Sequence, residues 1–524
     1  MSIDPFTLEV IRNGLSAIAE EMSLVVMRSA RSPLLREAGD LSSALTDRDG
    51  LLIAQGQDIP MHMGVMSFTV QEFLKIVPRD RLKPGDVWLL NLPQVGGNHL
   101  PDVKAIRPVF SGDRIVAFAV SLAHWADVGG AAPGSYYAAA YDAWQEGLRI
   151  PPLRIVTAEG PDEEKLAMVL ANVRGPEERR GDILAQVAAT RAADRRFAEM
   201  FARYGADEVE RAFAALHDRA ERQMRAAIAA LPDGVYDGED FMDDDGHGGA
   251  PTAVRVTMTI RGEEAVLDFS ASDDAVPGPI NTTRFITAAS VYYVMKAVCG
   301  PEIQPSAGCY RPLTIVTRPG SILDAPADKP VVGGNHETAQ RVADAVFLAF
   351  AKFAPEKLSA GGPTTAGLLI FGGHREDGTW TTFYEVHGGG EGARADRDGM
   401  PAIRAHMANV MGTPAEVVEA EYPIRVERQE ILRGTGGKGR HTGGDGLRRV
   451  YRARVDGLTL TTMCERMVVP PYGLEGGEAG APYRLTLVRA DGIETALPGK
   501  TNLRIAKGDR VIADSSGGGG YGKI

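Results

Sequence analysis

Two copies of a His-x-x-Asp tetrad constrain the fold of this chain more than any other feature of its sequence. The first copy is His99-Leu-Pro-Asp102, and the second, 25 residues further on, is His124-Trp-Ala-Asp127. Glycines adjoin both copies: Gly96-Gly97 precede the first, and Gly129-Gly130 follow the second. Imidazole nitrogens and carboxylate oxygens are usual ligands of a catalytic divalent metal. If both tetrads serve one site, the fold must bring their loops together.

An alternative interpretation is that the tetrads are polar loop residues that hydrogen-bond to nearby turns. A single copy would favour this alternative, whereas the duplication favours a metal site. Short apolar strands are predicted at residues 87–90 and 115–121, between glycine-containing loops. Each tetrad therefore falls at the end of a strand or just after it, and loops that strands hold in place often carry catalytic groups.

Size, charge and cysteine content exclude several classes of protein. A chain of 524 residues is expected to form two to four domains. The net charge of −12, without any run of basic residues, argues against nucleic acid as a partner. We find no apolar stretch of membrane-spanning length and no secretory leader, and therefore expect no membrane association and a cytoplasmic location. Three scattered cysteines are too few for a disulfide framework, in agreement with a reducing compartment.

The order of the periodic segments predicts an α+β fold with several domains. Asp4-Pro5 begins a predicted amphipathic helix that ends near residue 31, and a small hairpin follows at 43–54. Further helices are expected at 282–298 and 338–353. No sustained strand–helix–strand rhythm is present, which argues against a doubly wound sheet. We expect four parts: a metal-site α+β region (1–160), a helical connector (161–231), an α+β core with glycine-rich loops (232–445) and a β-rich C-terminal region (446–524).

Glycine-rich segments and a cysteine were considered as further sites. No segment matches the phosphate-binding loop G-x-x-x-x-G-K-[ST] or a dinucleotide fingerprint, so this chain is not expected to bind a nucleotide itself. Most of these segments are interpreted as tight turns. His336 and Glu337, at the start of a predicted helix, are equally compatible with a place in a site. Cys309 would need a basic partner to act as a nucleophile, and we favour a buried, structural role for it.

Several motifs in order along the chain resemble those of the hydantoinase B family. These motifs are Asn98-His-Leu-Pro-Asp102, Ala123-His-Trp-Ala-Asp-Val-Gly-Gly130, Pro277-Gly-Pro-Ile-Asn281, Ala307-Gly-Cys309, Gly333-Gly-Asn335, Gly388-Gly-Gly390 and Gly517-Gly-Gly-Gly-Tyr521. The resemblance runs from about residue 6 to the end of the chain. The family includes the B subunits of ATP-dependent N-methylhydantoinases, 5-oxoprolinases and lactamases, and related subunits of acetone and acetophenone carboxylases.

The resemblance implies an enzyme that consists of two kinds of subunit. A hydantoinase A-type partner with an actin-like fold binds ATP and phosphorylates the carbonyl or enol oxygen of the substrate. The B-type chain then completes the reaction at a divalent metal site, for which Zn, Mn and Fe suit histidine and carboxylate ligands almost equally. The implied assembly is a heterotetramer or larger.

The resemblance also implies a ligand set in this sequence. The ligands would be His99, Asp102 and His124, with a fourth from Glu37 or Asp40, between which the sequence leaves the choice open. Leu92 stands where many relatives have an aspartate, so an acidic group expected near the site is absent. That departure bears on the substrate class more than on metal binding. His62 is a weaker candidate, for which a structural role is favoured.

The chemistry of the reaction agrees with such a site. Phosphorylation of an amide oxygen makes a good leaving group, after which water must attack an imidate-like carbon. A metal lowers the pKa of bound water, and Asp127 or Asp40 is then the candidate general base, with His124 also at the reacting centre. We therefore predict a subunit of an ATP-dependent hydrolase of a cyclic amide such as a hydantoin, 5-oxoproline or a similar lactam. The alternatives are a carboxylase subunit that acts on a ketone-derived enol phosphate, and a scaffold whose metal only holds loops together.

Overall fold

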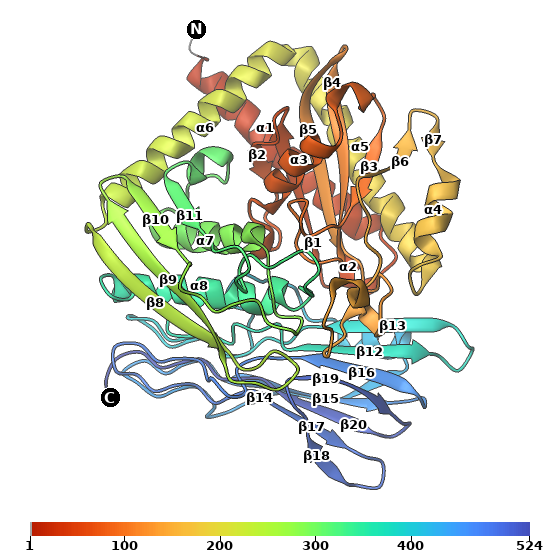
Figure 1. Ribbon diagram of the computed structural model, residues 1–524, viewed down its shortest axis with the longest axis vertical. Coiled ribbons are helices and arrows are strands. Elements are labelled where there is room, and N and C mark those ends of the chain that lie inside the picture. The colour runs from red at the N-terminus through yellow and green to blue at the C-terminus, as the bar shows by residue number, and fades with distance from the viewer. Residues whose placement is uncertain (1–2) are drawn as a thin grey trace.

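The computed structural model of the protein describes residues 3–524 and contains helices and strands in similar measure, arranged in four sheets (Figure 1). The predicted α+β fold class is therefore confirmed. The first helix, α1 (Pro5–Ser29), begins where the sequence predicts: the carboxylate of Asp4 accepts a hydrogen bond from the backbone N–H of Thr7 at 2.8 Å, and Pro5 occupies the first helical position.

A seven-stranded antiparallel sheet carries both tetrads. Its strand order is β2-β1-β5-β4-β3-β6-β7, so the two longest strands, β4 and β5, lie side by side in the middle. The bounds are β1 (Leu41–Asp47), β2 (Leu52–Gln55), β3 (Val87–Leu90), β4 (Asp102–Ser111), β5 (Arg114–His124), β6 (Leu153–Thr157) and β7 (Gly160–Pro161). The hairpin predicted at 43–54 corresponds to β1 and β2, with a turn at Gly50.

Helices pack on both faces of this sheet. On one face, α1, α5 (Pro176–Tyr204) and α6 (Ala206–Ala229) enclose an apolar core with the inward-facing residues of β4 and β5. The short helices α2 (Pro33–Arg36) and α4 (Glu163–Leu170) extend this layer. On the other face, α3 (Val65–Ile76) joins a second and larger core. Within residues 3–524, no helix combines the length and the apolarity that crossing a membrane requires.

A second sheet and two buried helices complete the larger core. The sheet has the order β11-β10-β9-β8 and is antiparallel except for β10 and β11. Its strands are β8 (Gly234–Met242), β9 (Thr252–Arg261), β10 (Glu264–Asp268) and β11 (Leu313–Val316). The helices α7 (Arg284–Cys299) and α8 (Ala339–Phe350) pack against each other and agree with the two predicted from the sequence.

Two further sheets lie at the C-terminal end of the molecule, at the bottom of Figure 1. Their orders are β13-β12-β16-β19 and β14-β15-β20-β17-β18, and the helix α9 (Ala415–Glu421) packs on β14. Strands on both sides of residue 446 pair with one another, β12 with β16 and β14 with β15. The four-part division of the chain stays a prediction. The strand bounds are β12 (Leu368–His374), β13 (Trp380–Glu385), β14 (Ile424–Leu432), β15 (Gly446–Ala453), β16 (Leu458–Met463), β17 (Arg484–Val488), β18 (Glu494–Ala496), β19 (Lys500–Ile505) and β20 (Arg510–Asp514).

The glycine-rich segments near the C-terminus pack backbone against backbone. Gly518 donates to the carbonyl of Gly444 and accepts from Gly437, while Gly390 donates to Ser516. A Cβ atom at Gly518 would lie 2.0 Å from the carbonyl oxygen of Glu391, closer than any side chain tolerates. These glycines are therefore required mainly for close approach of several segments, rather than for tight turns alone.

Candidate metal centre

His99, Asp102 and His124 converge on one point in the interior. Nε2 of His99 lies 3.2 Å from Nδ1 of His124, and Oδ1 of Asp102 lies 3.1 Å from the first nitrogen and 3.0 Å from the second. All three side chains are buried. Their donor atoms therefore form a nearly equilateral triangle, the arrangement of a possible metal-binding group among residues 3–524.

The strand register explains this convergence. β4 begins at Asp102 and β5 ends at His124, and the two residues are direct partners in the antiparallel ladder. The carboxylate and the imidazole therefore project side by side at one edge of the sheet. The backbone N–H of Asp102 bonds to the carbonyl of His99 at 3.1 Å, and this turn places the first histidine beside the pair.

Glycines set the paths of the two tetrad loops. Gly96 has φ +64°, and a Cβ there would lie 2.4 Å from the backbone of Phe68 in α3. Gly129 has φ +88°, and a Cβ there would lie 2.4 Å from the carbonyl oxygen of Asn172. Both positions thus combine a left-handed backbone with a close approach that only glycine allows. The glycines that adjoin the tetrads hold the loops against the neighbouring helices.

The hydrogen bonds of His99 determine which nitrogen carries its proton. Nδ1 lies 2.8 Å from the carbonyl oxygen of Val332, which only accepts, so Nδ1–H donates to it. In the neutral imidazole, Nε2 then presents a lone pair towards Asp102 and His124. A backbone carbonyl behind a histidine is the usual way in which proteins orient a metal ligand.

The donor set fits a divalent cation. Zinc lies about 2.0–2.2 Å from histidine nitrogens and carboxylate oxygens. Three donors separated by 3.0–3.2 Å leave room for a cation at that distance from each, just outside their plane. The opposite nitrogen of His124, Nε2, is buried without a hydrogen-bond partner among the described residues. Two imidazoles and a carboxylate would then occupy one face of the coordination shell.

Electrostatics of the three groups favour an ionised carboxylate. Burial by itself would raise the pKa of Asp102, but the contacts with His99, His124 and His62 outweigh it and hold that pKa well below its usual range. Burial lowers the pKa of His99. Burial acts in the same direction on His124, but the charges of Asp40 and Asp102 outweigh it, so the pKa of His124 is raised.

A second set of polar groups holds the other oxygen of Asp102. Nε2 of His62 lies 3.5 Å from Oδ2, and Nδ1 of the same ring lies 2.8 Å from Oγ of Ser42. The amide nitrogen of Asn335 lies 3.3 Å from Oδ2 and 3.3 Å from Nε2 of His99. His62, the weaker sequence candidate, thus lies against the carboxylate rather than in the triangle itself.

Aromatic residues and a His–Glu pair lie beside the triangle. The hydroxyls of Tyr136 and Tyr384 are 3.4 Å apart, and the ring of Tyr384 lies 4.7 Å from that of His124. His336, in a π-helical turn before α8, has its ring 6.1 Å from that of His99. Its Nδ1 lies 2.9 Å from Oε1 of Glu337. Burial lowers the pKa of His336 to about 3 and raises that of Glu337 to about 7.

The two acidic candidates before β1 have different environments. Asp40 is buried, its backbone carbonyl accepts the N–H of His124 at 3.1 Å, and its carboxylate makes no hydrogen bond within residues 3–524. The side chain of Glu37 is 35% exposed and pairs with Arg36 at 3.6 Å. The geometry therefore favours Asp40 over Glu37 as the acidic group of this centre.

Asp127 belongs to the second tetrad, but its oxygens face other partners. They accept the backbone N–H groups of Gly129 at 2.7 Å and Gly134 at 2.8 Å, and Arg174 lies at 3.1 Å. Burial outweighs these contacts and raises the pKa of Asp127. The two tetrads are thus used differently: the first contributes both residues to the triangle, and the second contributes only its histidine.

The remaining candidates lie outside the centre. Cys309 is fully buried among apolar side chains of the larger core, and its Sγ lies 3.1 Å from the carbonyl oxygen of Gln304. Leu92, at the position where relatives carry an acid, packs against the same core. Spacing in the sequence did not point to Tyr136 or Tyr384. Asn335 was noted as the last residue of the Gly333-Gly-Asn335 motif, but without a role.

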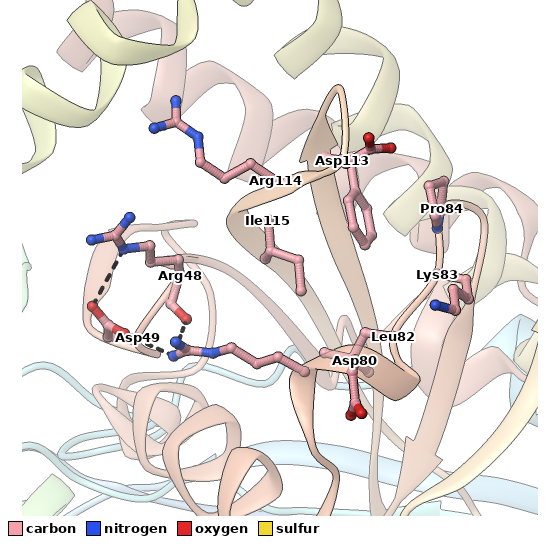
Figure 2. Close-up of a pocket in the computed structure, with 11 residues that line it drawn as sticks. Arg48, Asp49, Asp80, Leu82, Lys83, Pro84, Asp113, Arg114 and Ile115 are labelled. Carbon is pink, nitrogen blue, oxygen red and sulfur yellow. Dashed lines mark hydrogen bonds and ion pairs between the residues drawn. The ribbon is translucent and has the colours of Figure 1, made fainter.

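A surface cavity of about 600 Å³ lies far from the triangle (Figure 2). It is lined by the β1–β2 turn and the β4–β5 hairpin, including Arg48, Asp49, Asp113 and Arg114. β5 runs from Arg114 at the cavity to His124 at the triangle, roughly 30 Å away at about 3.3 Å per residue. This cavity is not part of the candidate centre.

Relatives of the chain match it over nearly its whole length. The β subunit of a caprolactamase from Pseudomonas jessenii is 31% identical over 531 residues, which cover 99% of this chain and 91% of that subunit. A 5-oxoprolinase from Dictyostelium discoideum is 31% identical over 528 residues. The aligned region covers 99% of this chain and 40% of that longer protein.

Solved structures also match nearly the whole length of the chain. The crystal structure of the ATP-dependent caprolactamase from Pseudomonas jessenii matches with a TM-score of 0.94 and 30% identity, over 100% of this chain and 92% of that one. The nucleotide-free structure of an acetone carboxylase shares the fold, with a TM-score of 0.90 and 18% identity over 99% of this chain and 76% of that one. The profile of the hydantoinase B/oxoprolinase family matches residues 4–524. The resemblance noted from the motifs is therefore confirmed, and the chain belongs to the hydantoinase B/oxoprolinase family.

Proposed function

We propose that the chain is the B-type subunit of an ATP-dependent hydrolase of cyclic amides. In this proposal His99, Asp102 and His124 hold a divalent metal (Zn, Mn or Fe), and the phosphorylated substrate is opened beside it. The observation that carries the proposal is the buried triangle of two imidazole nitrogens and one carboxylate oxygen, 3.0–3.2 Å apart. The names of two relatives, caprolactamase subunit beta and 5-oxoprolinase, support a lactam as the substrate class.

The residues of the chain would orient the metal ligands and the substrate. The carbonyl of Val332 holds the tautomer of His99, and His62 with Asn335 holds the free oxygen of Asp102. When bound, a divalent cation supplies a Lewis acid that lowers the pKa of water and neutralises developing charge. The hydroxyls of Tyr136 and Tyr384 are placed to donate hydrogen bonds to a substrate next to His124.

Ring opening also requires a base that removes a proton from the attacking water. Asp40 meets this requirement best among the sequence candidates, because its carboxylate has no hydrogen-bond partner and lies in the electrostatic field of His124. Asp127 shares its oxygens with Arg174 and two backbone N–H groups. His336, whose Nε2 is buried without a partner and whose Nδ1 faces Glu337, is a further candidate. The water adduct breaks its C–N bond, and the ring nitrogen takes up a proton and leaves as an amine. The acyl phosphate that remains is hydrolysed by a second water to a carboxylate and inorganic phosphate.

The proposed partner is a hydantoinase A-type subunit that binds ATP and phosphorylates the substrate, in a heterotetramer or a larger assembly. Two observations support it: the sequence contains no phosphate-binding loop, and the named relatives include a β subunit and an enzyme described as ATP-dependent. On this basis the purified single chain hydrolyses neither ATP nor a lactam.

The test is turnover by the complex of this chain with its ATP-binding partner. ATP-dependent release of the ring-opened product is measured with caprolactam, 5-oxoproline and hydantoin, for the wild type and for His124→Ala. The proposal expects turnover of at least one cyclic amide by the wild type and its loss in His124→Ala, with unchanged ATP affinity. ATP turnover that depends on bicarbonate and a ketone, without hydrolysis of any cyclic amide, would instead support the carboxylase alternative.

A further inference from the structure

Arg404 has a guanidinium group without a carboxylate partner close to the candidate metal centre. It lies in the irregular segment before α9 and is partly buried. Nη1 donates to the carbonyl oxygens of Ala366 at 2.8 Å and His387 at 3.2 Å. Within residues 3–524, Nε and Nη2 make no hydrogen bond, and neither atom is enclosed by the protein. One edge of the planar guanidinium is therefore bound to backbone carbonyls, and the edge with Nε and Nη2 has no hydrogen-bond partner within residues 3–524.

Its surroundings place Arg404 at the centre rather than on the outer surface. Burial lowers the pKa of Arg404, and the groups that offset this most are Tyr384, Glu337, Asp40 and Glu385, in that order. The ring of Tyr384 lies 4.7 Å from that of His124. Ala366, whose carbonyl accepts from Arg404, donates its own N–H to Oε1 of Glu337 at 2.9 Å. Glu337 in turn contacts His336, whose ring lies 6.1 Å from that of His99.

None of these neighbouring carboxyl groups is an ion-pair partner of Arg404. Glu385 bonds to Arg449 and lies 3.3 Å from the N–H of Thr413. Glu337 bonds to His336 at 2.9 Å. Asp40 is buried, and only its backbone makes hydrogen bonds within residues 3–524. A cation and an anion without partners thus both lie at the edge of the candidate centre.

The arginines of the surface cavity provide a contrast. Arg48 lies 3.7 Å from Asp49 (Figure 2). Arg79 lies 2.7 Å from the same residue, and Arg114 lies 2.6 Å from Asp207. Each of these three arginines thus has a carboxylate partner within the chain. A partly desolvated charge is costly unless it is paired, which implies that the partner of Arg404 is a bound ligand.

We propose that Arg404 binds the phosphoryl group of the activated substrate, through Nε–H and Nη2–H, while the reacting carbon lies against His99, Asp102 and His124. The fork geometry of a guanidinium matches two oxygens of a phosphate, and charge-assisted pairs of this kind are the strong ones. This inference rests on the proposed function, since it assigns a residue to the phosphoryl group that the partner subunit transfers.

The experiment measures binding of inorganic phosphate to the purified chain by isothermal titration, with and without Mn²⁺. The variants are Arg404→Met, Arg404→Lys and, as a matched control, Arg397→Met, which alters an exposed arginine of the same segment. We expect the dissociation constant to rise at least tenfold in Arg404→Met, by less in Arg404→Lys, and not in Arg397→Met, under both metal conditions. Thermal unfolding of each variant establishes that the protein is folded.

Acetate serves as the second ligand, because a carboxylate group is the other oxyanion that an arginine recognises. Phosphate should bind more tightly than acetate, and only the phosphate affinity should depend strongly on Arg404. The proposal is overturned if the wild type does not bind phosphate, if Arg404→Met leaves the affinity unchanged, or if acetate binds as tightly as phosphate.

Turnover of the assembled complex separates this inference from the proposed function. If no cyclic amide is hydrolysed but phosphate binding still depends on Arg404, the function fails and the oxyanion site remains. If a lactam is hydrolysed while Arg404→Met changes neither phosphate affinity nor KM, the function remains and the role of Arg404 is overturned.

Discussion

Nε2 of His99 lies 3.2 Å from Nδ1 of His124, although 25 residues separate the two histidines in the chain. Both nitrogens face Oδ1 of Asp102. Because Nδ1–H of His99 donates to the carbonyl of Val332, Nε2 of His99 carries an unprotonated lone pair. Lone pairs and a carboxylate at such short distances repel each other unless a proton or a cation lies between them. A proton on Nδ1 of His124 would relieve this repulsion in part, and a bound cation would relieve it for all three groups.

Removal of the two histidines should remove the metal. The double variant His99→Ala/His124→Ala leaves one carboxylate of the triangle, so we expect metal content to fall from about one equivalent to near zero. Elemental analysis of the purified chain measures this directly. His374→Ala, which alters an exposed histidine at the end of β12, is the control and should retain the metal.

The folded state of the double variant distinguishes a catalytic metal from a structural one. Retention of a cooperative unfolding transition, with loss of metal and of turnover, agrees with the proposed function. Collapse of the fold on loss of metal would support the scaffold alternative. Equal metal content in all three proteins would remove these histidines from the site.

Gln186 should be important for stability because it joins α5 to both central strands. Its side-chain nitrogen donates to the carbonyls of Val103 at 2.9 Å and Ser121 at 3.0 Å, and its oxygen accepts from Trp125, the residue after His124. Gln186→Leu leaves these buried groups without partners, and we expect a loss of about 3 kcal/mol in the free energy of unfolding. Urea denaturation measures it, with the exposed Gln223→Leu as control. Equal stability of both variants would contradict the prediction.

Arg466 is the centre of a buried ionic cluster between the second sheet, α8 and the C-terminal sheets. Its guanidinium contacts Asp240 and Asp344, each at 2.7 Å, and Arg341 lies 3.1 Å from Asp344. Arg466→Met would leave the buried carboxylates of Asp240 and Asp344 without their main cationic partner. Such a loss typically lowers the free energy of unfolding by about 3–5 kcal/mol. The urea midpoint of this variant should fall clearly below that of Arg425→Met, a substitution at an exposed arginine. The prediction fails if the two midpoints agree.

Acid should destabilise the fold through His217 on α6. Its ring is buried, neither nitrogen has a hydrogen-bond partner among the described residues, and the closest carboxylate, Asp47, lies 4.0 Å away. Burial lowers the pKa of His217 to about 4, with Arg311 acting in the same direction and Asp218 against it. Below about pH 6.5, His217 binds a proton in the unfolded chain but not in the folded chain, so the free energy of unfolding falls as the pH falls towards 4.

His217→Leu should remove this contribution. Between pH 7 and pH 5 the wild type should lose about 2 kcal/mol more than the variant. The urea midpoints of both proteins at the two pH values measure the difference. An identical pH dependence of the two proteins would show that His217 binds a proton as readily in the folded chain as in the unfolded chain.

Local features of the sequence were sufficient to predict many elements. The Asp4-Pro5 cap and the amphipathic pattern predicted α1, and short apolar runs at 87–90 and 115–121 predicted β3 and β5, because caps and periodicity act within a few residues. The order of the strands within each sheet was not predictable in this way. β12 pairs with β16 across more than eighty residues, and no local pattern encodes such a partner.

The candidate centre was likewise predictable from the sequence only in part. The repeat of the tetrad indicated a metal site, and the family resemblance then named His99, Asp102 and His124 as its ligands. Asp127 has the same local pattern as Asp102, yet Arg174 and two backbone N–H groups surround it. The difference arises from strand register, which places Asp102 opposite His124 and turns the second tetrad loop away.

The amino-acid sequence by itself determined the family, the mixture of helices and strands and the candidate metal ligands, since each depends on residue identity or short spacing. Only the tertiary structure decided which acidic residues lie at the centre, and which tyrosine, asparagine and arginine side chains surround it. Those residues come from segments as far apart as Asp40 and Arg404, which 364 positions separate in the sequence, and long-range packing alone brings them together.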